Sequence, residues 1–423
     1  MKTHADRRTL VQNTTALLGG HAVGLIAPLV IVPYLARVLR PEGWAPVLVA
    51  QALSAWLIII IEFGFDLSGT RAVARARVSP DRLEDVVTGV QSAKAFLVPL
   101  TCLVFVIALI LLPNVRRDPA MAASALLLTV FRGLSPFWFF QGMERVRRVV
   151  AVEASTKAAA AFLCFVLVSG PQDAWVVVAL QAAFAAISLA ILTLRMATMT
   201  TLRRPSLTLA IVAMRRSRHT FAFRASTGLY IQANALILGT LASPATVAFF
   251  GGAERLVRAS VNLLQPLTQA FFPRVSFLTS SNPAAARQAV KRSMLAIGGF
   301  GAVLGLGAFF GAPLLVRVLL GHGYEPAIPL LRALSPLPVL TAFGTVLGLY
   351  WAIPFGHERA LLIIVFTAGL INMALASILV PRYGGMGMAE AVILAEVFVT
   401  GSLAALYARR RNEDIVILEE LPA

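Results

Sequence analysis

Residues Gly252–Gln265 read GAERLVRASVNLLQ and place Glu254, Arg255 and Arg258 within a largely apolar run. The chain around this stretch has 423 residues, of which 58% are hydrophobic and only 13% are charged. Soluble globular proteins typically contain about 45–50% apolar residues. The composition therefore predicts a polytopic membrane protein, in which three charges on one membrane-spanning segment need an explanation.

Apolar runs of about 20 residues are long enough to cross a bilayer, and twelve of them can be drawn along the chain. Their approximate bounds are 11–36, 44–66, 93–113, 119–141, 152–170, 174–194, 220–242, 245–277, 293–320, 328–355, 360–380 and 386–407. These runs predict an all-α integral membrane fold with twelve transmembrane helices.

The basic residues, which give a net charge of +17, lie mostly between the apolar runs. If the N-terminus is cytoplasmic, the inner segments hold most of the 37 lysines and arginines, with Lys94 counted among the inner charges. The outer ends hold Arg37, Arg40, Arg116, Arg117, Arg317 and Arg382. Because lysine and arginine favour cytoplasmic loops, both termini are predicted to be cytoplasmic. Charge spread over so many loops also argues against nucleic-acid binding.

Two six-helix halves are predicted from the middle of the chain. The stretch LRRPSLTLAIVAMRRSRH (Leu202–His219) could form an amphipathic helix on an anionic leaflet. Pro41–Leu53 and Pro244–Leu256 align without a gap, as a parallel repeat of a transporter would. The predicted domains are an N-terminal lobe 1–200, a cytoplasmic linker 201–219, a C-terminal lobe 220–409 and a cytoplasmic tail 410–423.

The eighth predicted span carries a polar stripe. At about 100° per helical residue, one arc of an unbroken helix would hold all its polar positions. They are Glu254, Arg255, Arg258, Asn262, Gln265 and Gln269. The stripe could join helices through buried pairs. However, each arginine costs about 2.5–3.5 kcal/mol at mid-bilayer, and such charges usually line cavities or substrate paths. One glutamate cannot neutralise two arginines, so the stripe favours an anionic substrate.

Two other spans contain charges. In the second span Gln51, Glu62 and Asp66 would share an arc, and the two carboxylates could bind protons or sodium or pair with arginines. Asp66 is also compatible with a helix cap before the following segment. Arg132, in the middle of the fourth span, is expected to face a cavity.

Motifs of catalysis or cofactor binding are lacking in the sequence. It contains no HExxH or CxxC metal spacing, no GxxxxGK[ST] phosphate loop and no cysteine or serine with an evident base. The outer loops are too short for a catalytic domain. We therefore expect a secondary transporter without cofactor or metal, and not an enzyme.

Four stretches resemble the polysaccharide transporter family. They are PYLARVLRPEGWAPVLVAQAL (Pro33–Leu53), EFGFDLSGTRAVA (Glu62–Ala74), SPFWFFQGMERV (Ser135–Val146) and GGAERLVRASVNLLQPLTQAFFPRVS (Gly251–Ser276). This family includes the Wzx-type flippases of O-antigen and exopolysaccharide repeat units, within the multidrug/oligosaccharidyl-lipid/polysaccharide (MOP) superfamily. The chain departs from the family pattern at Asp66, where asparagine is expected, and at Arg40, where glycine is common.

The resemblance implies a flippase of the bacterial inner membrane for an undecaprenyl-pyrophosphate-linked oligosaccharide, with two lobes around a central cationic cavity. It implies that Arg255, Arg258 and Arg132 attract the pyrophosphate. Asn262, Gln265 and Gln269 would then bind sugar hydroxyls. Expected partners are this substrate, membrane lipids and the polymerase and chain-length regulator of the same pathway. Alternatives are a drug or sodium-coupled exporter of the superfamily, which an acidic cavity would favour, and a membrane-bound glycan polymerase or ligase.

Overall fold

The computed structural model describes residues 2–201, 203–268, 271, 275, 278 and 283–410, and the ordered elements in these ranges are helices. Contacts within the chain group it into two compact units, Met1–Thr240 and Leu241–Ala423. Each unit is described here by itself.

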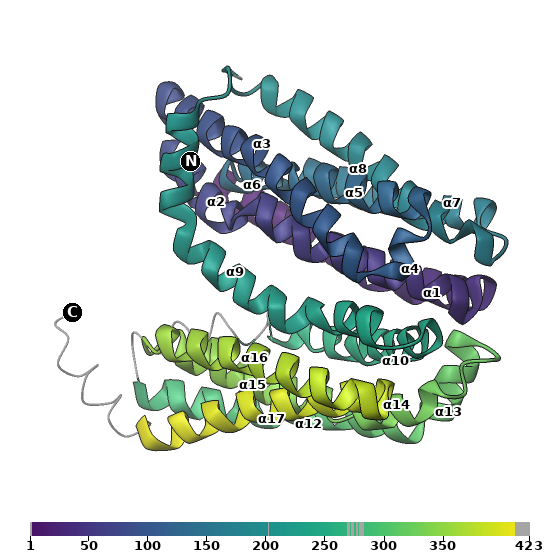
Figure 1. The fold of residues 1–423 in the computed structure, drawn as a ribbon. Helices are drawn as coiled ribbons and strands as arrows, with labels where there is room; N and C mark the ends of the chain where they lie inside the picture. Colours follow the sequence, from purple (N-terminus) through teal and green to yellow (C-terminus); the bar gives the residue numbers. More distant parts are fainter. Residues whose placement is uncertain are drawn as a thin grey trace. The chain divides into compact units, whose positions relative to one another are not determined.

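The first unit is built from long helices joined by short connections (Figure 1). Its elements are α1 (Lys2–Glu62), α2 (Phe65–Ala76), α3 (Pro80–Leu111), α4 (Pro113–Arg116), α5 (Pro119–Gly133), α6 (Phe137–Gly142), α7 (Val146–Leu167), η1 (Pro171–Asp173), α8 (Ala174–Ala197) and α9 (Leu207–Leu241). Part of its core lies where Phe65, Val87, Trp138 and Phe139 pack together, which fixes α2 and α6 against α3.

The second unit has the same all-helical character. Its described elements are α10 (Pro244–Asn262), α12 (Pro283–Phe310), α13 (Ala312–Leu315), η2 (Val316–Leu320), α14 (Ala327–Leu334), α15 (Leu337–Thr345), η3 (Val346–Ala352), α16 (Glu358–Tyr383) and α17 (Gly385–Arg410). Here a core forms around Ile297, Val346, Tyr350 and Trp351.

Both units expose large apolar side chains along their helices. Phe162, Val303 and Ile363 are each at least 64% exposed, as expected of side chains that face lipid. Among the described residues nine helices are long and apolar enough to cross a membrane. The protein is therefore a multi-pass membrane protein of the predicted all-α class. The count of twelve crossings stays a prediction. Helices α9 and α10 are not among the nine, and the first two predicted spans are represented by one candidate span, Val30–Ala76.

Three predicted spans that hold candidate site residues are broken beside their charges, which corrects the continuous helices expected from the sequence. The tenth span is also broken, at Ser335–Pro336 after Arg332. The second span breaks at Phe63–Gly64, the fourth at Leu134–Pro136 and the eighth at Leu263–Leu264. Glu62 and Asp66 therefore do not share the arc of one helix, and neither do Asn262 and Gln265.

Two of these breaks have a proline as their cause. Proline has no N–H to donate to the carbonyl four residues earlier, so Pro136 and Pro266 cannot bond to Arg132 and Asn262 in helical fashion. The third break uses positive backbone angles, with φ 44° at Phe63 and φ 73° at Gly64. Glycine adopts such a φ readily because it has no Cβ.

A kink at Arg40 separates the first two predicted spans inside α1. Arg40 has φ 55° and ψ 174°, which are not helical. This explains why glycine would be common there, since a positive φ disfavours residues with a side chain. Helix resumes at Pro41, just as α10 begins at Pro244 after Ser243.

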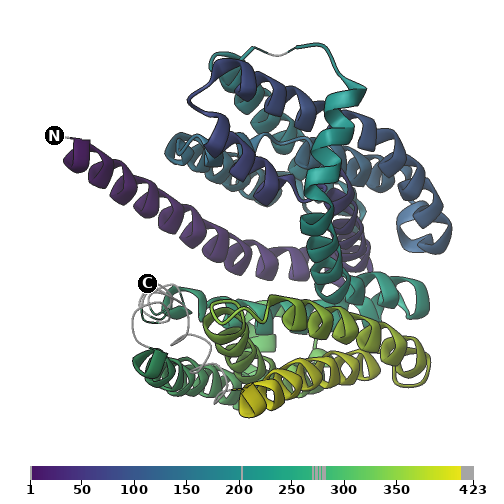
Figure 2. The same ribbon diagram turned by 90° about the vertical axis from the view of Figure 1, so that its left-hand side faces the viewer.

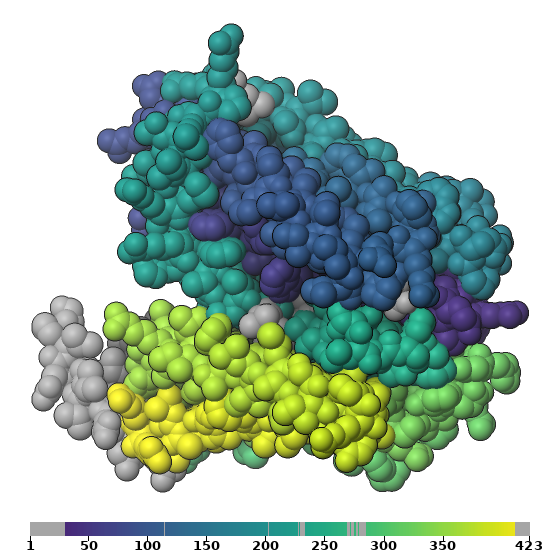
Figure 3. All heavy atoms as spheres, viewed as in Figure 1, coloured from purple at the N-terminus to yellow at the C-terminus, as the bar shows by residue number. Residues whose placement is uncertain are grey.

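The predicted linker helix and the seventh span form one helix, α9, which starts at Leu207. Its first turns pack on α3. Ala210 is fully buried, and the Ser206 N–H donates to the Ser92 hydroxyl at 2.9 Å. Figures 2 and 3 show α9 running along the first unit beside α3. The exposed side of these turns carries Arg215 and Arg216. The predicted lobe boundaries stay a prediction.

Candidate functional site

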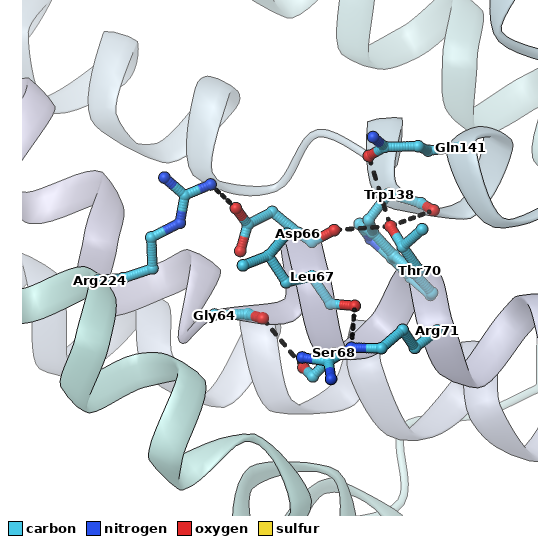
Figure 4. A network of polar contacts seen from close by, with 9 residues as sticks. All are labelled: Gly64, Asp66, Leu67, Ser68, Thr70, Arg71, Trp138, Gln141 and Arg224. Atoms are coloured by element: carbon cyan, nitrogen blue, oxygen red, sulfur yellow. Dashed lines mark hydrogen bonds and ion pairs between the residues drawn. The ribbon is translucent and has the colours of Figure 1, made fainter. Parts of the chain in front are cut away.

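The corner between α1 and α2 carries a polar network (Figure 4). Asp66, in the first turn of α2, forms an ion pair with Arg224 of α9. The Thr70 hydroxyl lies 2.6 Å from the Asp66 carbonyl oxygen and 3.0 Å from that of Trp138 in α6. Gln141, at the end of α6, lies 3.5 Å from the same hydroxyl. The network thus joins three helices of the first unit.

Further contacts hold α9 on this corner. The Ser68 and Ser217 hydroxyl oxygens are 2.6 Å apart, and the Phe63 and Phe221 rings stack with centroids 4.2 Å apart. A Cβ on Gly64 would lie only 2.8 Å from the Phe221 nitrogen. A side chain at position 64 would therefore push α9 away.

These contacts bear on the alternatives left open for Asp66. Its carboxylate pairs with an arginine, as one alternative expected. The N-cap of α2 is Gly64, without a side-chain cap, so the capping alternative does not apply. A carboxylate in the first turn of a helix also interacts favourably with the helix dipole.

Glu62 differs from Asp66. It is the last residue of α1, is partly buried, and makes no hydrogen bond or ion pair with the described residues. The positive charges of Lys94, Arg224 and Arg132 attract its carboxylate from beyond ion-pair distance. Glu62 is therefore a carboxylate among three cations that it does not touch.

Lys94 lies where the sequence did not lead us to expect it. It is only 2% exposed, and its ammonium group donates to the carbonyl oxygens of Gly133 and Ser135, each at 2.9 Å. Its assignment to the inner loop charges was wrong. The helical spacing could have revealed this, because Lys94 continues the buried positions Val90 and Leu97 at steps of three and four residues.

Arg132 stands in the last turn of α5, immediately before the carbonyl groups that Lys94 binds. Its side chain is exposed in this unit, and it forms no ion pair with the described residues. It is consequently a cation that can meet an anion from outside the unit.

In the second unit, α10 carries the predicted pair. Arg258 donates from Nε at 3.1 Å and from Nη2 at 2.8 Å to one oxygen of Glu254. Glu254 is only 13% exposed and Arg258 is 40% exposed. The partly buried Arg255 interacts electrostatically with Glu254 and with Tyr324. The carboxylate of Glu254 thus interacts with the guanidinium groups of both Arg255 and Arg258.

The remaining predicted residues lie around the end of α10. Asn262 is its last residue and is partly buried, whereas Gln265 is exposed beyond the turn. Gln269 lies outside the described residues. No group of three or more histidine, cysteine or acidic side chains in the described ranges could hold a metal ion.

An arginine outside this group, Arg332, has a local explanation. It lies over the ring of Phe309 at 5.6 Å and donates to the Phe309 carbonyl at 3.4 Å. Arg132 and α10, by contrast, belong to different units.

Solved structures show the fold. The chain is similar to the lipid II flippase MurJ in an inward closed conformation, with a TM-score of 0.67, 12% identity and coverage of 98% of this chain and 94% of that one. It is also similar to a eukaryotic MATE transporter, AtDTX14, with a TM-score of 0.59, 14% identity and coverage of 97% of this chain and 100% of that one. A MOP superfamily transporter from Pyrococcus furiosus gives 0.57 and 16% identity, over 98% and 96% of the two chains.

Curated relatives match over nearly the whole length. A protein of Escherichia coli K12 is 26% identical over 413 residues, 97% of this chain and 99% of that protein. One of Shigella dysenteriae is 28% identical over 397 residues, 92% and 97% of the two chains. Both are named "Putative O-antigen transporter". Residues 10–279 match the family described as "Polysaccharide biosynthesis protein". The resemblance predicted from the sequence is thereby confirmed, and the chain belongs to this polysaccharide biosynthesis family.

Proposed function

We propose that the protein is a flippase that moves an oligosaccharide linked to undecaprenyl pyrophosphate across a bacterial inner membrane. The observation that carries the proposal is the coincidence of helix breaks with arginines inside predicted membrane spans, in a chain of this family. Broken membrane helices are typical of transporter binding sites, because their freed backbone groups and charges are tolerated where they line a cavity.

The relatives support this class of substrate. Two full-length relatives bear the name of O-antigen transporters, and the structural neighbour MurJ bears the name of a lipid II flippase. Both names concern a glycan that crosses a membrane. We propose that this chain carries a repeat unit used to build O-antigen, capsule or exopolysaccharide.

The arginines would bind the pyrophosphate. The planar guanidinium group donates to phosphate with two parallel N–H groups, which suits an anionic headgroup better than a point charge does. On α10, Glu254 binds Arg258 and leaves a net positive charge together with Arg255. In our proposal this charge and Arg132 attract the pyrophosphate, and Asn262, Gln265 and Gln269 bind sugar hydroxyls.

Alternating access would expose the bound headgroup to either side in turn, while the lipid tail stays in the bilayer. A membrane potential that is negative inside favours the outward movement of each negative charge by about 2.3 kcal/mol per 100 mV. A cation returning on Glu62 would add to this. Asp66 is less suited to that task because it already pairs with Arg224.

We place the protein in the inner membrane with both termini in the cytoplasm, as the loop charges favour. The polymerase and the chain-length regulator of the same pathway would be its protein partners. The names of the relatives support transport without catalysis. A small-molecule exporter is the second candidate, favoured by the fold shared with MATE transporters.

Neutralising the α10 arginines tests the proposal. Arg255→Gln and Arg258→Gln should abolish surface glycan while the protein still accumulates in the membrane. Arg→Lys should be milder, because lysine keeps the positive charge but cannot donate two parallel N–H groups to phosphate. Glu254→Gln should weaken export least. The measurement is glycan export alongside membrane abundance in each variant.

Arg332→Gln is the matched control, since Arg332 is bound locally at Phe309. It should leave export unchanged. If the pair served structure alone, Glu254→Gln and Arg258→Gln would both lose protein from the membrane, because breaking a buried pair costs about 3–5 kcal/mol. Normal export by an abundant Arg255→Gln, Arg258→Gln double variant would refute the proposal.

A further inference from the structure

The break in the fourth span leaves backbone carbonyl groups that need donors. The Ser135 N–H bonds to the Arg132 carbonyl at 3.1 Å, a tightened last turn, and Pro136 has no N–H to offer. Within a membrane an unsatisfied carbonyl is costly. The Lys94 ammonium group meets this need by donating hydrogen bonds to the Gly133 and Ser135 carbonyl oxygens.

A neutral donor could have met the same need. Burying an ammonium group is more costly than burying an amide or a hydroxyl, so the charge of Lys94 calls for a reason of its own. Two are visible. A cation is favourable at the C-terminal end of α5 because of the helix dipole. Lys94 also attracts the Glu62 carboxylate electrostatically.

The charges around Glu62 can be assigned one by one. Arg224 already pairs with Asp66, and the nearby Glu153 pairs with Lys157 at 3.0 Å. Lys94 is then the cation that balances Glu62. Arg132 is left over, although it lies within the attraction of the same carboxylate.

The end of α5 is also held from its other side. Gly133 packs so closely on α1 that a Cβ there would lie 2.8 Å from Ile61, the neighbour of Glu62. Lys94 binds the carbonyl of the same glycine. Arg132, the preceding residue, therefore leaves α5 from a turn that is fixed on two sides.

We propose that Lys94 is a positioning residue that keeps Arg132 available to an anionic pyrophosphate headgroup. It does so by fixing the broken fourth span and by balancing Glu62, which would otherwise neutralise Arg132. This inference rests on the proposed function and deepens it. It assigns a role in substrate binding to a buried residue that does not itself touch the substrate.

The test uses the purified full-length protein and farnesyl pyrophosphate as the probe. Lys94→Met keeps an unbranched side chain that is one atom shorter and removes the charge and the donors. We expect it to weaken probe binding about tenfold, as loss of a charged hydrogen bond does, and Arg132→Gln to do the same. The double variant should bind no more weakly than Arg132→Gln alone, because residues acting through one another are not additive.

Lys157→Met is the matched control, because this exposed lysine of the same unit is paired with Glu153. It should bind the probe like the wild type. Additive losses in the double variant, or unchanged binding by an abundant Lys94→Met, would overturn the role of Lys94. A wild-type protein that does not bind the probe would overturn the proposed function as well.

Two further variants cover the case in which Lys94→Met does not fold. Lys94→Gln keeps donors for the carbonyl groups but removes the charge. Wild-type affinity for the probe in this variant would contradict the proposal that the charge of Lys94 balances that of Glu62. Adding Glu62→Gln to Lys94→Gln should restore the affinity for the probe, because it removes the charge that competes for Arg132 once Lys94 no longer balances it. An affinity of this double variant equal to that of Lys94→Gln alone would also overturn the inference.

Discussion

Single residues decide how charge is held in this chain. Asp66 and Glu254 each pair with an arginine of their own unit, whereas Glu62 touches none of the described cations. Carboxylates that are alike in the sequence thus serve different tasks. Paired carboxylates favour a fixed structure, and an unpaired one is better suited to take up and release a cation.

Glu62→Gln therefore tests ion coupling at the residue scale. If Glu62 carries a cation back, the variant should change the pH or sodium dependence of flipping in vesicles. Asp66→Asn is the matched control, because the family pattern favours asparagine there. It should leave the ion dependence as it is. An unchanged ion dependence in Glu62→Gln, at full expression, would leave Glu62 without a coupling role.

Gly64 offers a second residue-scale prediction, about stability. Gly64→Ala places a Cβ at φ 73° and within 2.8 Å of the α9 backbone. The backbone angle alone costs about 1–2 kcal/mol, and overpacking adds about 1–3 kcal/mol. We expect a clear fall in the melting temperature of the purified protein.

Gly356→Ala separates these two costs. Gly356 has φ 79°, but a Cβ there would meet nothing within 4 Å. Its variant should suffer from the backbone angle alone and lose less stability than Gly64→Ala. Equal losses in the two variants would show that α9 does not press on the α1–α2 corner.

At the scale of the elements, helix breaks next to charges are the recurring feature. The length of the apolar runs predicted the all-helical membrane class, because apolar length is a direct requirement of the bilayer, whereas the number of twelve spans stays a prediction. Unbroken helices were the wrong assumption. Pro136 and Pro266 indicated two of the breaks, since proline removes a backbone hydrogen bond of a helix. The break at Phe63 had no such signal beyond Gly64.

The partners of the charges were harder to predict than the breaks. Arg224 lies 158 positions after Asp66 along the chain, and only the packing of α9 on the corner brings the two together. Lys94 looked like a loop charge because it stands at the start of an apolar run. Its spacing in α3 pointed to a buried position, but the carbonyl groups of α5 that it binds could not be predicted from any pattern in α3.

At the scale of the whole molecule, the internal repeat has a structural counterpart. The register that aligns Pro41 with Pro244 also aligns Gln51 with Glu254 and Glu62 with Gln265. In each half the helix begins after a break, at Arg40 or Ser243, and ends at another. An amide thus aligns with an acid at the first of these two aligned positions and an acid with an amide at the second, so the two helices carry their carboxylates at different places.

Topology is the prediction that belongs to this scale. Twelve crossings, an even number, put both termini on one side, and the concentration of arginines in the inner loops puts that side in the cytoplasm. A reporter that is active only in the cytoplasm should therefore be active when it is fused after Arg410. Inserted at Asp173, between α7 and α8, it should be silent, while a periplasmic reporter should give the opposite pattern at both places. The comparison is informative because α9 and α10 are not among the described helices that are long and apolar enough to cross a membrane. If α10 alone failed to cross, the number of crossings would be odd, and the fusion after Arg410 would report the periplasm.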